Sequence, residues 1–108
     1  MKIELDFLNM KNEKSFHTVF KKVMGFPKFY GMNGDAWIDC MSCIDEKDNK
    51  MTMVNIQPGE SLDIFVFHIE YIIQNNSKLF LNFMELVACV NQRFKEDNKG
   101  TNLNVIVF

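Results

Sequence analysis

The amino-acid sequence predicts an α/β fold, a three-stranded parallel sheet packed by helices, with a fourth strand as the alternative. Strand-like apolar runs open and close the chain, and a third lies between them. The segments that join these runs are about a dozen residues or longer and carry helical spacing of apolar residues. Such connections place neighbouring strands in parallel through right-handed crossovers. The 108 residues contain no linker, so residues 1–108 are expected to form one domain.

The first strand and the first helix are predicted by a change in apolar spacing. Residues 2–7, KIELDF, alternate apolar with charged side chains, which is the period of a strand. After Asn12 the apolar side chains follow helical spacing, at Phe16, Val19, Phe20, Val23 and Met24. Asn12 suits an N-cap, and Gly25 with Pro27 beyond it predicts the end of this helix.

A second helix is predicted from Asn33, its N-cap, to about Ile44. Its core face is expected to consist of Trp37, Cys40, Met41 and Ile44. The opposite face carries Asp35, Asp39, Ser42 and Glu46. Ile38 lies on the border between the two faces. Asp35 is favourable in the first turn, but Asp35 and Asp39 are one turn apart and repel each other.

The remaining chain predicts a loop, two strands and a long helix. Residues 45–50 have the composition of a solvated loop, and residues 51–56 suit either a short strand or an extended arm. Residues 62–72, LDIFVFHIEYI, are nearly continuous in apolar residues, which predicts a strand buried on both faces. Helical spacing then runs from about residue 77 and stops near Gly100, before another predicted buried strand, LNVIVF.

Charge and cysteine content limit the classes of function. Twelve Lys and Arg residues against 14 Asp and Glu residues give a net charge of −2, so no basic stripe is available for nucleic-acid phosphates. The amino-terminal segment lacks the apolar run of a secretion signal, and no run reaches the length of a membrane span. The three cysteines fit free thiols in a reducing compartment. We therefore expect a cytoplasmic protein that contacts neither nucleic acid nor membrane directly.

Cysteine and histidine residues raise the question of a metal or redox site. Cys40 and Cys43 form a CxxC, the spacing of many zinc and redox pairs, but neither His17 nor His68 lies at ligand spacing from it. Cys40 also falls on the apolar helix face, where a thiol behaves as a small hydrophobe. His17, in the first helix, and His68, inside the predicted buried strand, are expected to be structural. We expect no metal and no cofactor.

Asp35 and Asp39 admit three interpretations. Paired carboxylates can act as general acid and base, but hydrolysis usually needs one carboxyl whose pKa is raised by burial, and both lie opposite the core face. Composition alone favours a solvated acidic face. The third interpretation is a binding surface for a cationic site on another protein.

The segment from Phe16 to Cys43 resembles the barstar family of intracellular inhibitors of barnase-type ribonucleases. In that family a helix of the FHTVFKK type leads through a Pro-x-aromatic-Tyr-Gly turn into an Asn-x-Asp-Ala-x-x-Asp-Cys helix, and residues 27–40 read PKFYGMNGDAWIDC. A barstar-like subgroup carries residues 35–42, DAWIDCMS, in nearly this form. More loosely, RFKEDNKG and LNVIVF are similar to the family's closing helix and strand.

The resemblance implies a ribonuclease inhibitor whose carboxylates take the place of a substrate phosphate in a basic active site. By position, Asp35 and Asp39 are the helix carboxylates that enter this site, and Glu96 is the acid on the last helix. The loop before the helix matches at Phe29, Tyr30 and Gly31. The surrounding contact surface is expected from Asn33, Ile38, Ser42 and Cys43.

The sequence also departs from the family pattern. Phe29 lacks the hydroxyl of the family's Tyr, and Gly34 replaces a larger residue at a helix-propensity cost of about 1 kcal/mol. Trp37 and Ile38 stand where the family has Leu and then Trp, and residues 45–61 form a longer connection. We expect a monomeric, noncatalytic inhibitor of a basic ribonuclease. The alternatives are an interaction or regulatory module with a non-nuclease partner and, third, a thiol or zinc protein using the CxxC.

Overall fold

The computed structural model describes residues 1–108 and contains three strands and three α-helices. The elements follow one another as β1 (Lys2–Asp6), η1 (Phe7–Asn9), α1 (Glu13–Met24), α2 (Gly34–Met41), η2 (Lys47–Asn49), β2 (Ser61–Phe67), α3 (Ile69–Glu96) and β3 (Asn102–Val107). The strands form one parallel sheet in the order β1-β2-β3. The predicted α/β class and the three parallel strands are confirmed. Residues 51–56 form no strand, so the alternative with four strands is wrong.

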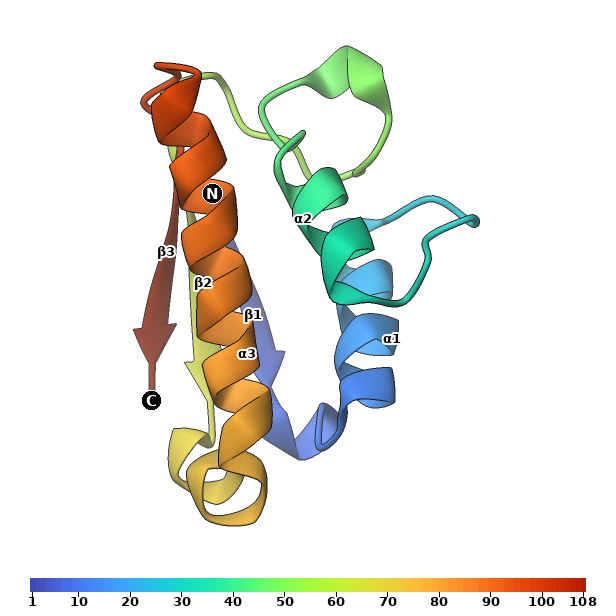
Figure 1. Cartoon of the computed structure of the whole chain (residues 1–108), viewed down its shortest axis with the longest axis vertical. Helices are drawn as coiled ribbons and strands as arrows, with labels where there is room; N and C mark the ends of the chain where they lie inside the picture. Colours follow the sequence, from blue (N-terminus) through green and yellow to red (C-terminus); the bar gives the residue numbers. More distant parts are fainter.

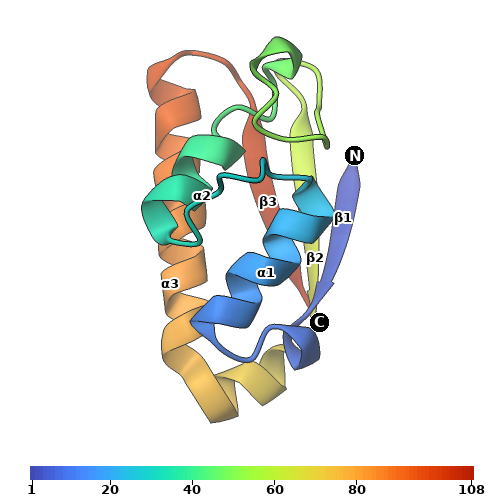
Figure 2. The same ribbon diagram turned by 90° about the vertical axis from the view of Figure 1, so that its right-hand side faces the viewer.

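The molecule has two layers, because the helices lie on one face of the sheet (Figures 1 and 2). In the register of the sheet, Ile64 in the central strand lies between Ile3 and Val105. The strand side chains buried beneath the helices are Ile3, Leu5, Leu62, Ile64, Val66 and Leu103. Side chains of β2 on the other face are only half-buried. The prediction of strands buried on both faces is therefore wrong for β2 and β3, since no helix covers the second face.

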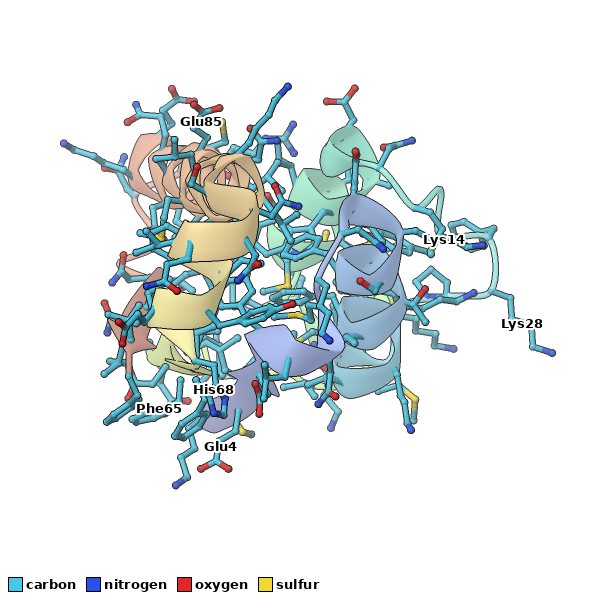
Figure 3. All side chains as sticks on the ribbon, turned by 90° about the horizontal axis from the view of Figure 1, so that it is seen from below. Glu4, Lys14, Lys28, Phe65, His68 and Glu85 are labelled. Atoms are coloured by element: carbon cyan, nitrogen blue, oxygen red, sulfur yellow. The ribbon has the colours of Figure 1, made fainter.

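The uncovered face of the sheet carries aromatic side chains. The ring of Phe108 stacks on Phe65 and Phe67, at centroid distances of 5.8 and 5.1 Å. Figure 3 shows Phe65 and Glu85 on opposite sides of the molecule, because Phe65 belongs to the uncovered sheet face and Glu85 to the outer side of α3. Contacts among these rings, together with the ammonium of Lys2 over Phe65, shield part of the apolar surface from water.

The strand predicted over residues 62–72 ends early. β2 stops at Phe67, and His68 adopts the left-handed conformation, φ 62°, before α3 begins. The apolar residues that follow belong to a helix, where Ile72 is fully buried. His68 is consequently not in a buried strand: its side chain is 53% exposed and its Nδ1 lies 2.8 Å from the Asp6 carboxylate. A continuous apolar run does not distinguish a strand from a strand followed by a buried helical turn.

The helix predicted from about residue 77 is present as the second part of α3. Asn76 interrupts the helix, with φ −160° and ψ 66°. Its Oδ1 accepts from the amide of Leu79 at 3.3 Å, and its Nδ2 donates to the carbonyl of Lys11 at 3.1 Å. Asn76 therefore caps the longer segment and ties the kink to the start of α1.

The first helix has the predicted ends. The side chains of Asn12 and Ser15 form a reciprocal capping box, and Gly25 closes the helix in the left-handed conformation, φ 69°. Aromatic side chains from α1, α2 and α3 then meet in the core above the sheet: Phe16, Phe20, Trp37 and Phe83. None of the helices combines the length and the apolar character needed to cross a membrane.

The predicted solvated loop at residues 45–50 is anchored at its first residue. The Asp45 side chain is buried, accepting from the hydroxyl of Thr101 at 2.8 Å and from the ammonium of Lys99 at 3.2 Å. Further along, the amides of Met53 and Val54 both donate to the carbonyl of Met24. The long connection between α2 and β2 is thus fixed to the end of α1 and to the start of β3.

Candidate protein-binding surface

The second helix ends at Met41, three residues before its predicted end at Ile44, and it presents the two faces that its sequence predicts. Its Asn33 cap accepts from the amide of Ala36 at 2.8 Å. All four predicted core residues are buried, namely Trp37, Cys40, Met41 and Ile44. On the other side Asp35 and Asp39 are exposed, while Ile38 and Ser42 are half-buried. The helix therefore offers its carboxylates to the solvent from a rigid, packed support.

An open cleft of about 570 Å³ lies between α2 and the last turns of α3. We call it the acidic cleft and define it by its polar lining: Asp39, Ser42, Cys43, Glu46, Asn49, Arg93, Glu96, Asp97 and Lys99. Four of the ten residues expected to bind a partner line it together, namely Asp39, Ser42, Cys43 and Glu96. Acidic residues outnumber basic ones in this lining, so the cleft complements a cationic partner.

The other expected contact residues lie outside the cleft lining. Phe29 is 77% exposed in the loop before α2, and Gly31, Asn33 and Asp35 are exposed as well. Asn33 uses its side-chain oxygen as the helix cap, and its Nδ2 donates to the carbonyl of Gly31 at 3.3 Å. These residues form a second exposed group at the amino-terminal end of α2.

Tyr30 is buried, which corrects its expected place on the contact surface. The residue is 6% exposed, and its hydroxyl lies 2.6 Å from Nδ1 of His17. Burial raises the pKa of Tyr30 and lowers that of His17, against the opposing charge of Glu13. The tyrosine hydroxyl is therefore protonated, the imidazole is neutral, and the two groups share a hydrogen bond. Tyr30 holds the loop before α2 against α1 and presents no hydroxyl to a partner.

Sequence reasoning did not identify Arg93 as a member of this site. Its guanidinium Nη1 donates to Oδ1 of Asp39 at 3.0 Å across 54 residues of sequence. The partners have side chains that are 51% and 63% exposed, so the pair contributes at most about 1 kcal/mol. Arg93 supplies a counter-charge to Asp39, which offsets its repulsion with Asp35. In the sequence, the only indication that Arg93 belongs to the site is its position one turn before Glu96 on the same helix.

Lys99 lines the acidic cleft and is paired with two carboxylates. Its ammonium donates to Asp45 at 3.2 Å and to Glu46 at 3.1 Å. Burial alone would lower the pKa of Lys99, but the bonds to Glu46 and Asp45 outweigh burial and raise it. The same ion pair is the main cause of the lowered pKa of Glu46. Glu46 is therefore already paired inside the chain, whereas Glu96 makes its side-chain bond only to the neutral amide of Gln92.

The CxxC residues are thiols in this environment. Burial raises the pKa of Cys40 to about 11, and the neighbouring Cys43 and Asp39 add to the effect. Burial also raises the pKa of Cys43, whose sulfur accepts from Nδ2 of Asn49 at 3.4 Å. Metal binding and thiol exchange both need thiolate, which this surrounding disfavours. No group of three or more His, Cys, Asp or Glu residues is placed to hold a metal ion.

Comparison with known proteins gives a family for the chain. The model of the family described as barstar (barnase inhibitor) matches residues 1–106. The match extends beyond the segment 16–43 that carries the resemblance in the sequence, and it includes both sides of the acidic cleft. No curated protein matches the chain.

Proposed function

The chain belongs to the barstar (barnase inhibitor) family, and on this premise we propose that it inhibits a ribonuclease in the cytoplasm without catalytic activity of its own. The observation that carries the proposal is the acidic cleft, where Asp39 of α2 and Glu96 of α3 line one open surface. Two separate elements thereby hold carboxylates on rigid supports against the same space. If the acids of α2 were only a solvated helix face, no acid on α3 would be needed beside them.

The chemistry of a ribonuclease active site explains why carboxylates suit this role. Such a site gathers Arg, Lys and His around the position of a phosphate, and a carboxylate can accept the same charge-assisted hydrogen bonds. Asp39 remains available to a partner, because its counter-ion within the chain is an exposed arginine that a partner can displace at small cost. Asp35 and Phe29 extend the contact towards the amino-terminal end of α2.

The second candidate is an interaction module for a non-nuclease partner, and Arg93 favours it. Because Arg93 places a cation beside Asp39, the acidic cleft also suits a partner surface of mixed charge. Such a partner would supply a cation to Asp39 and an acid to Arg93. The two candidates differ in whether a barnase-type ribonuclease is bound and inhibited.

The test measures binding and inhibition of barnase-type ribonucleases by the purified chain and by three variants. We expect Asp39→Ala and Glu96→Ala each to weaken binding at least tenfold, which corresponds to about 1.4 kcal/mol or more. Glu70→Ala is the matched control, since Glu70 is an exposed acid in the first turn of α3, at the other end of the helix from Glu96. The thermal midpoints of the three variants should stay close to that of the parent.

Two outcomes contradict the proposal. Binding that survives Asp39→Ala and Glu96→Ala undiminished removes the acidic cleft from the interface. If no barnase-type ribonuclease binds at all, the interaction module becomes the better assignment, and its partner is then to be sought by its mixed charge.

A further inference from the structure

A second cavity, separate from the acidic cleft, lies where α1, the start of α2 and the middle of α3 meet. Its volume is about 280 Å³, and it shares no lining residue with the acidic cleft. The apolar part of its lining consists of Phe16, Leu79, Phe83 and Leu86. Three of these four side chains belong to the buried core, so the cavity has a preformed apolar floor.

Gly34 leaves this cavity room at the α2 side. A Cβ built on Gly34 would lie 3.1 Å from Cδ2 of Leu86, which is closer than ordinary contact. The residue that departs from the family pattern at this position therefore has a consequence beyond helix propensity. It allows α2 to approach α3 closely while keeping side-chain atoms out of the cavity.

Two neutral polar residues, His17 and Asn82, also line the cavity, and His17 is the buried one. The residue is 2% exposed and lines the cavity, and its Nδ1 is hydrogen-bonded to Tyr30, which does not line it. Because Nδ1 is bonded to Tyr30, Nε2 is the ring nitrogen left for the cavity. This Nε2 makes no hydrogen bond, since the nearest carboxylate oxygen, Oε1 of Glu13, is 4.0 Å away. One ring nitrogen of His17 thus lacks a hydrogen-bond partner beside a space that can hold one.

The charge around the opening has one sign. Glu13 and Glu85 are both exposed and both line the cavity, whereas no Lys or Arg does. Figure 3 shows Glu85 directed outwards from α3, away from the sheet. An occupant with a cationic end would be attracted to this rim, and an anionic one would be repelled.

We propose that this cavity binds a small organic amine that has a ring-sized apolar body, an ammonium group and a hydroxyl oxygen. The body lies on Phe16 and Phe83, the hydroxyl forms a hydrogen bond with Nε2 of His17, and the ammonium lies between Glu13 and Glu85. The volume is at the lower limit of small-molecule sites, which are about 300–1,000 Å³, and so suits one ring with a short chain. The site does not depend on the proposed ribonuclease inhibition.

The experiment is a titration of the full chain with three probes, followed by amide NMR. Tyramine carries all three groups, 4-ethylphenol lacks the ammonium, and 3-(4-hydroxyphenyl)propionate replaces it by a carboxylate. We expect saturable binding of tyramine below about 1 mM, with shifts at Gly34, Leu86 and Cys89. We also expect 4-ethylphenol to bind at least fivefold more weakly and the carboxylate not to saturate.

Variants of the rim separate specific binding from a general affinity for amines. Glu85→Gln should weaken tyramine binding about two- to fivefold, because an exposed ion pair is worth up to about 1 kcal/mol, and leave 4-ethylphenol unchanged. Glu70→Gln is the control and should change neither. Cys89→Trp should block the cavity, and a matching thermal midpoint would show that the variant is folded. Equal binding of all three probes, shifts confined to the acidic cleft, or no saturation by any probe overturns the proposal.

Discussion

At the scale of single residues, Arg93 determines how readily the acidic helix can bind a cationic partner. The Asp39 carboxylate is already paired, because the guanidinium of Arg93 donates to it at 3.0 Å. The pair is exposed, so the bond is weak and reversible. A cationic partner must compete with Arg93, whose presence lowers the affinity of the site for simple cations.

Removal of Arg93 should therefore strengthen binding of a cationic partner. For Arg93→Gln we expect about two- to fivefold tighter binding of a barnase-type ribonuclease, since an exposed pair of up to about 1 kcal/mol no longer has to be broken. Arg93→Lys keeps the charge and serves as the control, with affinity close to that of the parent. Weaker binding by Arg93→Gln would mean instead that Arg93 itself contacts an acidic residue of the partner.

Buried His17 predicts a pH dependence of stability. Burial lowers the pKa of His17 below 6.5 in the folded chain. At a pH between the folded-state pKa and 6.5, the unfolded chain therefore binds more protons than the folded one. The contribution of His17 to the free energy of unfolding is then complete above pH 6.5, and it decreases as the pH falls below this value. Denaturant unfolding at pH 7 and pH 5.5 should show this decrease in the parent and a smaller one in His17→Gln. A variant with the same decrease as the parent would exclude His17 as its cause.

At the scale of elements, the sequence predicts those boundaries that are encoded by local chemistry. The capping residues Asn12 and Asn33 and the left-handed Gly25 all lie where expected, because each satisfies backbone groups within a few residues of itself. The predicted end of β2 is wrong, because Ile69 and Ile72 belong to α3. Their apolar side chains pack against the core from a helix, and this packing depends on the tertiary structure.

The candidate site divides in the same way. Helical spacing alone predicts that Asp35 and Asp39 point away from the core, and the family resemblance adds Glu96. The Arg93 pair, the buried place of Tyr30 and the anchoring of Asp45 all depend on contacts between distant segments. Asp45 illustrates the limit of prediction from sequence. A charged residue in a polar run is expected to be solvated, and the burial of Asp45 follows only from its contacts with Lys99 and Thr101, which are distant in the chain.

At the scale of the whole molecule, a small net charge is combined with a strong local asymmetry. The chain carries a net charge of −2, and the acidic cleft holds four acids, Asp39, Glu46, Glu96 and Asp97, against two bases, Arg93 and Lys99. The opposite face of the sheet instead exposes aromatic rings and charges of both signs, such as Lys2 and Glu4. Attraction of a cationic partner is therefore directional and acts mainly near the cleft.

This asymmetry predicts a salt dependence of association with a barnase-type ribonuclease. The association rate constant should fall about tenfold or more between low salt and 0.5 M salt, because screening shortens the reach of the cleft's field. The dissociation rate constant should change much less, since the contacts that hold the complex are shielded from solvent. Stopped-flow or surface-binding kinetics measure both constants, and Asp39→Ala should show a shallower slope than Glu70→Ala. An association rate constant that is indifferent to salt would contradict a charge-steered encounter and would assign recognition to apolar contacts such as Phe29, which is the most exposed aromatic side chain beside α2.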